Sequence, residues 1–122
     1  MAATLRIELF PTSLAASVTF YSTVLQFEVV KDDRPHGGDY VAVGRDGVRI
    51  GLGRRPAATA TDRQPATAVE IVIEVDDVEA ERDHVLAAGW KLDADLVARP
   101  WGVTDFRILD PDGYYLRITE RH

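Results

Sequence analysis

Two stretches of the chain alternate apolar and polar side chains with the period of a half-buried strand. They read Leu5-Arg-Ile-Glu-Leu9 and Val69-Glu-Ile-Val-Ile-Glu-Val75. Because successive side chains of a strand point to opposite faces, each stretch predicts one face that packs on a helix and a second face that does not.

A helix is predicted after each of these strands. The first is expected over about 14–25, capped by Thr12 or Ser13, and the second from Asp76 or Asp77 to about Ala88, with Gly89 as its end. The predicted apolar face of the first helix consists of Leu14, Val18, Tyr21 and Leu25. The predicted inner side of the second consists of Val78, Arg82, Val85 and Leu86.

A hairpin is predicted near the end of each half. Strands over about 40–43 and 48–52 flank Asp46-Gly47, and strands over 105–109 and 114–119 flank Asp110-Pro-Asp-Gly113. Residues 31–39 are interpreted as a polar loop. The order of elements recurs with an offset of about 64–66 residues, which predicts a repeated βαβββ unit. We therefore expect one domain over 1–122, with modules at about 4–53 and 69–120 and a linker at 54–68.

The second face of the predicted sheets collects charged side chains, aromatic side chains and two glycines. Its expected members are Arg6, Glu8, Arg49, Gly51, Gly53, Glu70, Glu74, Phe106, Tyr115 and Arg117, with Phe106 opposite Arg117. Such a face is either the solvated side of an open sheet or the wall of an amphipathic pocket. Glycine inside a strand often marks a close approach of a ligand or backbone, which favours the pocket.

Composition narrows the classes of function. The chain has 122 residues, of which 46% are hydrophobic and 28% charged, and a net charge of −6, which argues against nucleic acid as a partner. It has no cysteine, so disulfides and thiolate chemistry are excluded. No apolar run reaches the ~18 residues that span a membrane, and the start lacks a signal-peptide pattern. A cytoplasmic location without a membrane partner is expected.

Several segments resemble the vicinal oxygen chelate superfamily, which includes glyoxalase I, extradiol dioxygenases and bleomycin-resistance proteins. The matching segments are the stretch from Ser13 to Phe27, Val75-Asp-Asp-Val78, Ala87-Ala-Gly89 and Asp110-Pro-Asp-Gly-Tyr114. The resemblance implies an α+β fold, in which two βαβββ modules with mixed sheets curve into a bowl-shaped cleft. It also implies a homodimer.

The resemblance places four metal-binding positions of the family's enzymes on Arg6, Gly51, Glu70 and Arg117. Only Glu70 can ligate a metal, since arginine is a permanent cation. The histidines His36, His84 and His122 are expected at the surface. We therefore predict neither a metal nor another cofactor.

The segment Arg99-Pro-Trp-Gly102 before the second hairpin resembles the bleomycin-resistance type of protein. There, aromatic side chains hold a planar drug group in a groove formed across a homodimer. The resemblance gives Trp101 the role of stacking on the ligand, and the alternative is that Trp101 caps the edge of the core. Trp90 is expected to pack in the core.

Three hypotheses of function follow. The first is a metal-free binding protein, not an enzyme, that sequesters an aromatic natural product or antibiotic. Its expected ligand-binding residues are Trp101, Phe106, Tyr115, Arg117, Arg6, Glu8, Tyr40, Arg49, Gly51 and Glu70, with Tyr40 on a rim or lid over 33–40. The second is a metal-dependent lyase, isomerase or dioxygenase. The third is a metal-free enzyme with Glu70 or Glu74 as general base, although an adjacent arginine makes a carboxylate a poor base. In an alternative interpretation, the arginines and glutamates form ion networks that shape the floor of the pocket.

Overall fold

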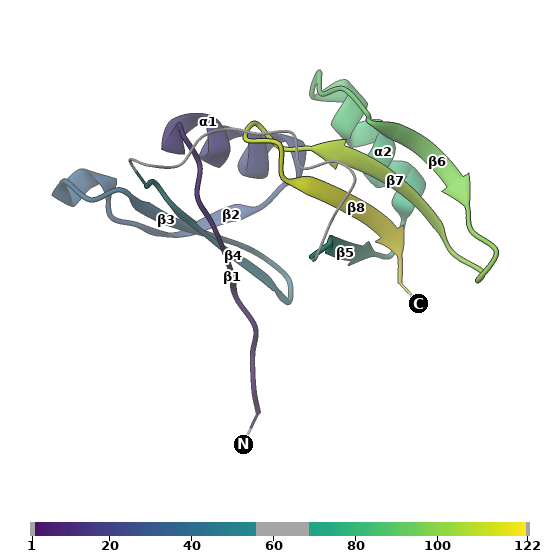
Figure 1. The fold of residues 1–122 in the computed structure, drawn as a ribbon, viewed down its shortest axis with the longest axis horizontal. Helices are drawn as coiled ribbons and strands as arrows, with labels where there is room; N and C mark the ends of the chain where they lie inside the picture. Colours follow the sequence, from purple (N-terminus) through teal and green to yellow (C-terminus); the bar gives the residue numbers. More distant parts are fainter. Residues whose placement is uncertain (1, 56–68, 122) are drawn as a thin grey trace. The chain divides into compact units, whose positions relative to one another are not determined.

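Each alternating stretch supplies the first strand of a four-stranded sheet (Figure 1). The computed structural model describes residues 2–55 and 69–121. Its internal contacts divide the chain into two units, residues 1–60 (unit 1) and 61–122 (unit 2). Each unit is described by itself.

Unit 1 is a βαβββ module whose sheet has the strand order β1-β4-β3-β2. Strand β1 runs parallel to β4, and the other neighbours are antiparallel. In chain order the elements are β1 (Ile7–Leu9), α1 (Leu14–Thr19), the π-helical turn η1 (Phe20–Val24), β2 (Glu28–Asp32), the 3-10 turn η2 (Arg34–His36), β3 (Tyr40–Arg45) and β4 (Val48–Gly53).

Unit 2 repeats this topology with the strand order β5-β8-β7-β6, in which β5 runs parallel to β8. Its elements are β5 (Ile71–Val75), α2 (Val78–Ala87), β6 (Ala94–Ala98), β7 (Thr104–Leu109) and β8 (Tyr115–Glu120). The α+β class and the two βαβββ modules with mixed sheets are therefore confirmed.

The helix boundaries follow the predicted local signals. The Ala16 N–H donates to the Ser13 side chain at 3.2 Å, and the Ala80 N–H donates to Asp77 at 3.0 Å. These two residues are thus the caps, which satisfy backbone donors that the first turn of a helix leaves unpaired. Gly89 follows α2 with a φ of +81°, a left-handed conformation that ends the helix at little cost.

Buried apolar side chains lie between each helix and one face of its sheet. The predicted face of the first helix is confirmed, because Leu14, Val18, Tyr21 and Leu25 are all buried. Three expected core positions are wrong: Leu5, Val69 and Leu86 are 79%, 73% and 48% exposed. The first two precede the paired part of their strands, which begins at Ile7 and Ile71. On α2 the buried side consists of Val78, Glu81 and Val85.

The edge strands β2 and β6 are not among the predicted strands. The predicted loop over 31–39 overlaps the end of β2, whose side chains are exposed or half-buried. Both edge strands also carry an irregularity, between Val29 and Lys31 in β2 and between Ala94 and Val97 in β6. Because a bulge adds an unpaired residue, it breaks the alternation of period two by which strands are found.

The second hairpin has a register one residue away from the predicted one. Leu109 pairs with Tyr115, so five residues rather than four form the loop. The Asp110 carboxylate accepts hydrogen bonds from the backbone N–H groups of Asp112 and Tyr114, both at 2.9 Å, which holds Tyr114 in the loop. The expected pairing of Phe106 with Arg117 is therefore wrong. Phe106 pairs with Ile118 and is fully buried in the core, because a shift of one residue moves a side chain to the other face.

Two expectations fall partly or wholly outside the described residues. The linker predicted over 54–68 is described only at Arg54 and Arg55, and His122 lies outside. No helix within 2–55 or 69–121 combines the length and the apolar character needed to cross a membrane.

Candidate functional site

The face of the unit 1 sheet turned away from α1 carries a short chain of hydrogen bonds. Glu8 pairs across the sheet with Gly51, and its Oε2 accepts from Arg6 Nε at 2.8 Å and from the Tyr40 hydroxyl at 3.0 Å. A Cβ atom at Gly51 would overlap the Glu8 carboxylate and the Tyr40 hydroxyl. Gly51 thus supplies the space in which these two groups meet.

This hydrogen-bond chain changes the acidity of Tyr40. Partial burial raises the pKa of the Tyr40 hydroxyl above its ordinary value, and the hydrogen bond to the Glu8 carboxylate raises it further. The charges of Arg6 and Arg49 act in the opposite direction and lower this pKa.

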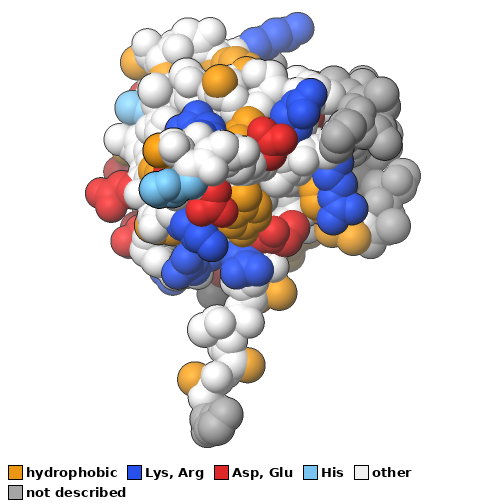
Figure 2. Space-filling view, turned by 90° about the vertical axis from the view of Figure 1, so that its left-hand side faces the viewer, with side chains coloured by type: hydrophobic (Ala, Val, Ile, Leu, Met, Phe, Trp, Pro, Cys, Tyr) orange, Lys and Arg blue, Asp and Glu red, His pale blue; other side chains and the backbone are white. Residues whose placement is uncertain are grey.

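Figure 2 shows that basic and acidic side chains lie next to one another around a small hydrophobic area on one side of the molecule. The net charge of −6 therefore does not describe the local surface.

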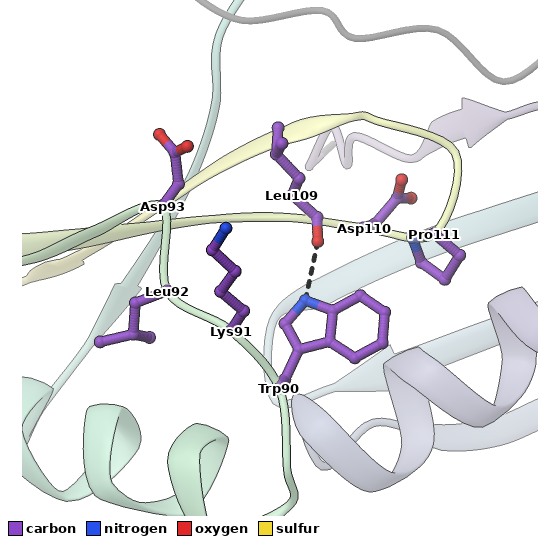
Figure 3. Close-up of a pocket in the computed structure, with 7 residues that line it drawn as sticks. All are labelled: Trp90, Lys91, Leu92, Asp93, Leu109, Asp110 and Pro111. Atoms are coloured by element: carbon purple, nitrogen blue, oxygen red, sulfur yellow. Dashed lines mark hydrogen bonds between the residues drawn. The ribbon is translucent and has the colours of Figure 1, made fainter.

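Unit 2 contains a cavity of about 310 Å³. Its lining residues are Trp90, Lys91, Leu92, Asp93, Leu109, Asp110 and Pro111 (Figure 3). The Trp90 N–H donates to the Leu109 carbonyl at 2.8 Å. The Trp90 side chain is half-buried, so the expectation that it packs in the core is met only in part. The other residues of this lining carry no sequence pattern that would have predicted a cavity.

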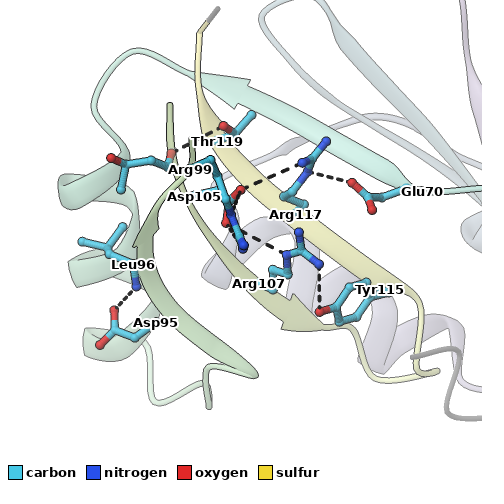
Figure 4. Close-up of polar contacts among 10 residues, drawn as sticks. Glu70, Asp95, Leu96, Arg99, Asp105, Arg107, Tyr115, Arg117 and Thr119 are labelled. Atoms are coloured by element: carbon cyan, nitrogen blue, oxygen red, sulfur yellow. Dashed lines mark hydrogen bonds and ion pairs between the residues drawn. The ribbon is translucent and has the colours of Figure 1, made fainter. Parts of the chain in front are cut away.

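The opposite face of the unit 2 sheet from α2 holds a cluster of charges centred on Asp105 (Figure 4). Asp105 is fully buried, and its two oxygens accept hydrogen bonds from Arg99 Nε at 2.9 Å and Arg99 Nη2 at 2.8 Å. A paired arrangement of this kind is among the stronger polar contacts in proteins. The hydrogen bond to Asp105 raises the pKa of the Arg99 guanidinium.

Two further arginines complete this arginine cluster. Arg107 of β7 and Arg117 of β8 pair across the sheet, and their nearest nitrogens lie 4.0 and 3.9 Å from Asp105 oxygens. Arg117 Nε also lies 2.7 Å from Glu70 Oε1. The Tyr115 hydroxyl accepts a long hydrogen bond of 3.5 Å from Arg107 Nη1 (Figure 4). The cluster is therefore an ion network on the sheet face.

Trp101 lies at the tip of the hairpin between β6 and β7. Trp101 is 57% exposed. The turn that carries it is closed by a hydrogen bond from the Gly102 N–H to the Arg99 carbonyl at 3.0 Å. Gly102 has a φ of +98°, which a residue with a side chain rarely adopts. The exposure of Trp101 does not fit the alternative of a cap on the edge of the core.

The predicted site residues fall into two groups, one on each unit. Unit 1 brings together Arg6, Glu8, Tyr40 and Gly51, with Arg49 exposed nearby on β4. Unit 2 brings together Glu70, Tyr115 and Arg117. Phe106 takes no part in this face.

The sequence reasoning misses Arg99, Asp105 and Arg107 as members of the site. The Arg99–Asp105 contact closes across the hairpin, and the loop register places Arg107 beside Arg117. Neither contact follows from a local pattern. The charge of Arg99, Asp105 and Arg107 was the one signal in the sequence that could have indicated them as site residues.

The side chains present do not fit the divalent metal of the family's enzymes. At Gly51 the space for a ligand is filled by Glu8 and Tyr40, and at Glu70 the carboxylate is paired with Arg117, itself a cation. Within the described parts of the chain, no three His, Cys, Asp or Glu side chains gather as a metal site. His36 is exposed and His84 half-buried.

Comparison with known proteins gives a family and a fold. The family model described as the Glyoxalase/Bleomycin resistance protein/Dioxygenase superfamily matches residues 4–118. No curated protein matches the sequence.

Three of the similar solved structures cover nearly the whole chain. TioX from Micromonospora sp. ML1 is 20% identical, with 99% of this chain and 100% of TioX covered and a TM-score of 0.81. A bleomycin resistance determinant encoded on the transposon Tn5 is 16% identical, with 99% of both chains covered and a TM-score of 0.78. Lactoylglutathione lyase from Agrobacterium tumefaciens is 21% identical, with 98% of this chain and 94% of the lyase covered and a TM-score of 0.73. At these identities the similarities show the fold alone.

Proposed function

Because the chain belongs to the glyoxalase/bleomycin resistance protein/dioxygenase superfamily, we propose that it is a small-molecule binding protein. Its ligand is an aromatic natural product or antibiotic, which it sequesters without chemical conversion. The superfamily contains both binding proteins and enzymes, so the fold alone does not choose between them. The choice rests on the site.

The exposed indole of Trp101 is the observation that carries this proposal. A flat apolar ring presented at a hairpin tip offers a surface on which an aromatic ligand stacks. A bleomycin resistance determinant shares this fold, so the fold is compatible with a ligand of this kind. Arginine and glycine at the family's metal positions support binding rather than metal-assisted catalysis.

A fluorescence titration tests this proposal. The Trp90→Phe variant leaves Trp101 as the single tryptophan, and it is titrated with bleomycins, enediyne-type compounds and quinones. Stacking on Trp101 should quench its emission. In the wild-type background, Trp101→Ala should weaken binding by about tenfold, as expected for the loss of one aromatic contact.

Two outcomes would overturn the proposal. Equal affinity of wild type and Trp101→Ala would remove the indole from the site, and a product formed from the ligand would replace binding by catalysis. The homodimer belongs to the same proposal, and sedimentation at the titration concentration should give a dimer. A clean monomer would contradict a groove shared between two chains.

The second candidate is a metal-dependent enzyme, which the fold similarity to a lactoylglutathione lyase favours. It requires one divalent metal per chain to survive dialysis. We expect elemental analysis to find none, since the groups at the metal positions repel or exclude a cation.

A further inference from the structure

Two arginines face each other across neighbouring strands of unit 2. Arg107 and Arg117 are register partners, and like charges directly opposite each other destabilise a sheet. Asp105 lies within 4.0 Å of both and offsets part of this repulsion. Its oxygens, however, already accept the two hydrogen bonds from Arg99. Asp105 thus holds the two guanidinium groups close together without hydrogen-bonding to them.

Both arginines keep hydrogen-bond donors for another group. The Nε atoms of Arg107 and Arg117 are buried, and neither has a hydrogen-bond acceptor among residues 2–55 and 69–121. Arg117 Nε lies 2.7 Å from Glu70 Oε1, but this ion pair lacks hydrogen-bond geometry. Unsatisfied buried donors destabilise a folded protein, so their presence indicates an acceptor that the described residues do not supply. Each side chain is 22% exposed as a whole while its Nε atom is buried, so a solute reaches the exposed part of each arginine, and the side chain must turn for Nε to take part.

The charge of the cluster identifies that acceptor. Three guanidinium groups contact two carboxylates, Asp105 and Glu70, so these five side chains together carry one positive charge in a chain whose net charge is −6. We propose that Arg107 and Arg117 bind an oxyanion, and that the ligand of this protein is an aromatic carboxylate. The planar guanidinium presents its N–H donors as a fork that matches the two oxygens of such a group.

Apolar side chains on the same face receive the rest of this ligand. Val72 pairs with Arg117 and is 38% exposed, and Val97 pairs with Asp105 and is 41% exposed. Paired residues of neighbouring strands share a face, so apolar surface borders the charges. The assignment of an aromatic body rests on the proposed function, whereas the oxyanion site rests on the arginines alone.

Calorimetric titration with naphthoate, naphthamide and inorganic phosphate separates these two parts. Naphthoate and naphthamide share the aromatic body and differ in charge. We expect naphthoate to bind wild type about tenfold more tightly than naphthamide, and to weaken as salt is added. Phosphate should compete with naphthoate for the two arginines.

The variants Arg107→Gln and Arg117→Gln should each remove the preference for naphthoate and leave the affinity for naphthamide unchanged. Arg121→Gln is the matched control, because Arg121 is exposed and pairs with Asp76 away from the cluster. Arg107→Gln also relieves the repulsion between register partners. Its melting temperature without ligand should equal or exceed that of wild type, whereas a purely structural arginine would lower it.

Each outcome decides one part. Equal binding of naphthoate and naphthamide would overturn the oxyanion site and leave aromatic binding standing. Binding of phosphate without naphthoate would support the oxyanion site and overturn the aromatic ligand. Failure of both anions to bind at millimolar concentration, or a preference retained in Arg107→Gln and Arg117→Gln, would overturn the inference.

Discussion

Units 1 and 2 share one topology but place different chemistry at equivalent positions of their sheets. In unit 1, Glu8 of β1 is the register partner of Gly51 in β4. In unit 2, Val72 of β5 is the register partner of Arg117 in β8, which in turn pairs with Arg107 of β7. A glycine thus stands in one unit where the other has an arginine. The repeated topology determines where side chains converge, and the individual residues determine what they bind.

The two units also differ in how they hold a carboxylate. The Glu8 side chain is 38% exposed and is contacted by a neutral hydroxyl as well as Arg6, whereas Asp105 is fully buried among three arginines. An exposed ion pair contributes little to stability, while a buried charge depends strongly on its partners. The comparison therefore predicts that neutralising the carboxylate of Asp105 lowers the stability of the protein more than neutralising that of Glu8.

The largest effect is expected from Asp105→Asn. Neutralising Asp105 leaves three arginines with one remaining carboxylate, so the free energy of unfolding should fall by about 3–5 kcal/mol. Denaturation in urea measures it. Glu8→Gln is the matched substitution in unit 1, and there the loss should stay below about 1 kcal/mol. Equal losses for the two variants would remove the contrast between the units.

A smaller effect, confined to alkaline pH, is expected from Tyr40→Phe. Burial and the Glu8 carboxylate raise the pKa of Tyr40 in the folded state above the ordinary value of 10.0. The neutral hydroxyl therefore contributes stability that is fully present below pH 10.0 and is lost as pH rises through the raised pKa. Tyr40→Phe should lose less stability than wild type over that window. Superimposable profiles of stability against pH would contradict the pairing of Tyr40 with Glu8.

An effect limited to one hydrogen bond is expected from Gly51→Ala. The added methyl group must displace the Glu8 carboxylate and the Tyr40 hydroxyl, both of which end flexible side chains. Stability should fall by about 1 kcal/mol, the typical contribution of one hydrogen bond. Near-UV absorbance titration should show the pKa of Tyr40 moving back toward its ordinary value.

Gly53→Ala provides the control for that substitution. A Cβ at Gly53 would lie 3.5 Å from the Tyr40 ring, an ordinary contact, so the Tyr40–Glu8 hydrogen bond should survive. If both alanine variants titrate like wild type, Gly51 does not serve to bring Glu8 and Tyr40 together.

Features that depend on neighbouring residues could be predicted from the sequence. The sequence narrowed each helix cap to two adjacent residues, of which Ser13 and Asp77 are the caps, and it predicted Gly89 as the end of α2 and the strands β1 and β5. These signals work because a cap, a positive φ or a strand face involves residues only a few positions apart.

The arrangement of the charged faces was decided only by the tertiary structure. The Asp110 carboxylate lengthens the loop by one residue, which buries Phe106 and sets Arg107 opposite Arg117. The bulges in β2 and β6 interrupt the alternation of side chains, so these two strands could not be predicted from the sequence pattern. Cross-strand register depends on loop length and irregularities, and one residue of shift exchanges the two faces. The sequence therefore specified the repeated fold, whereas the register assembled the arginine cluster and the folded hairpin left Trp101 exposed.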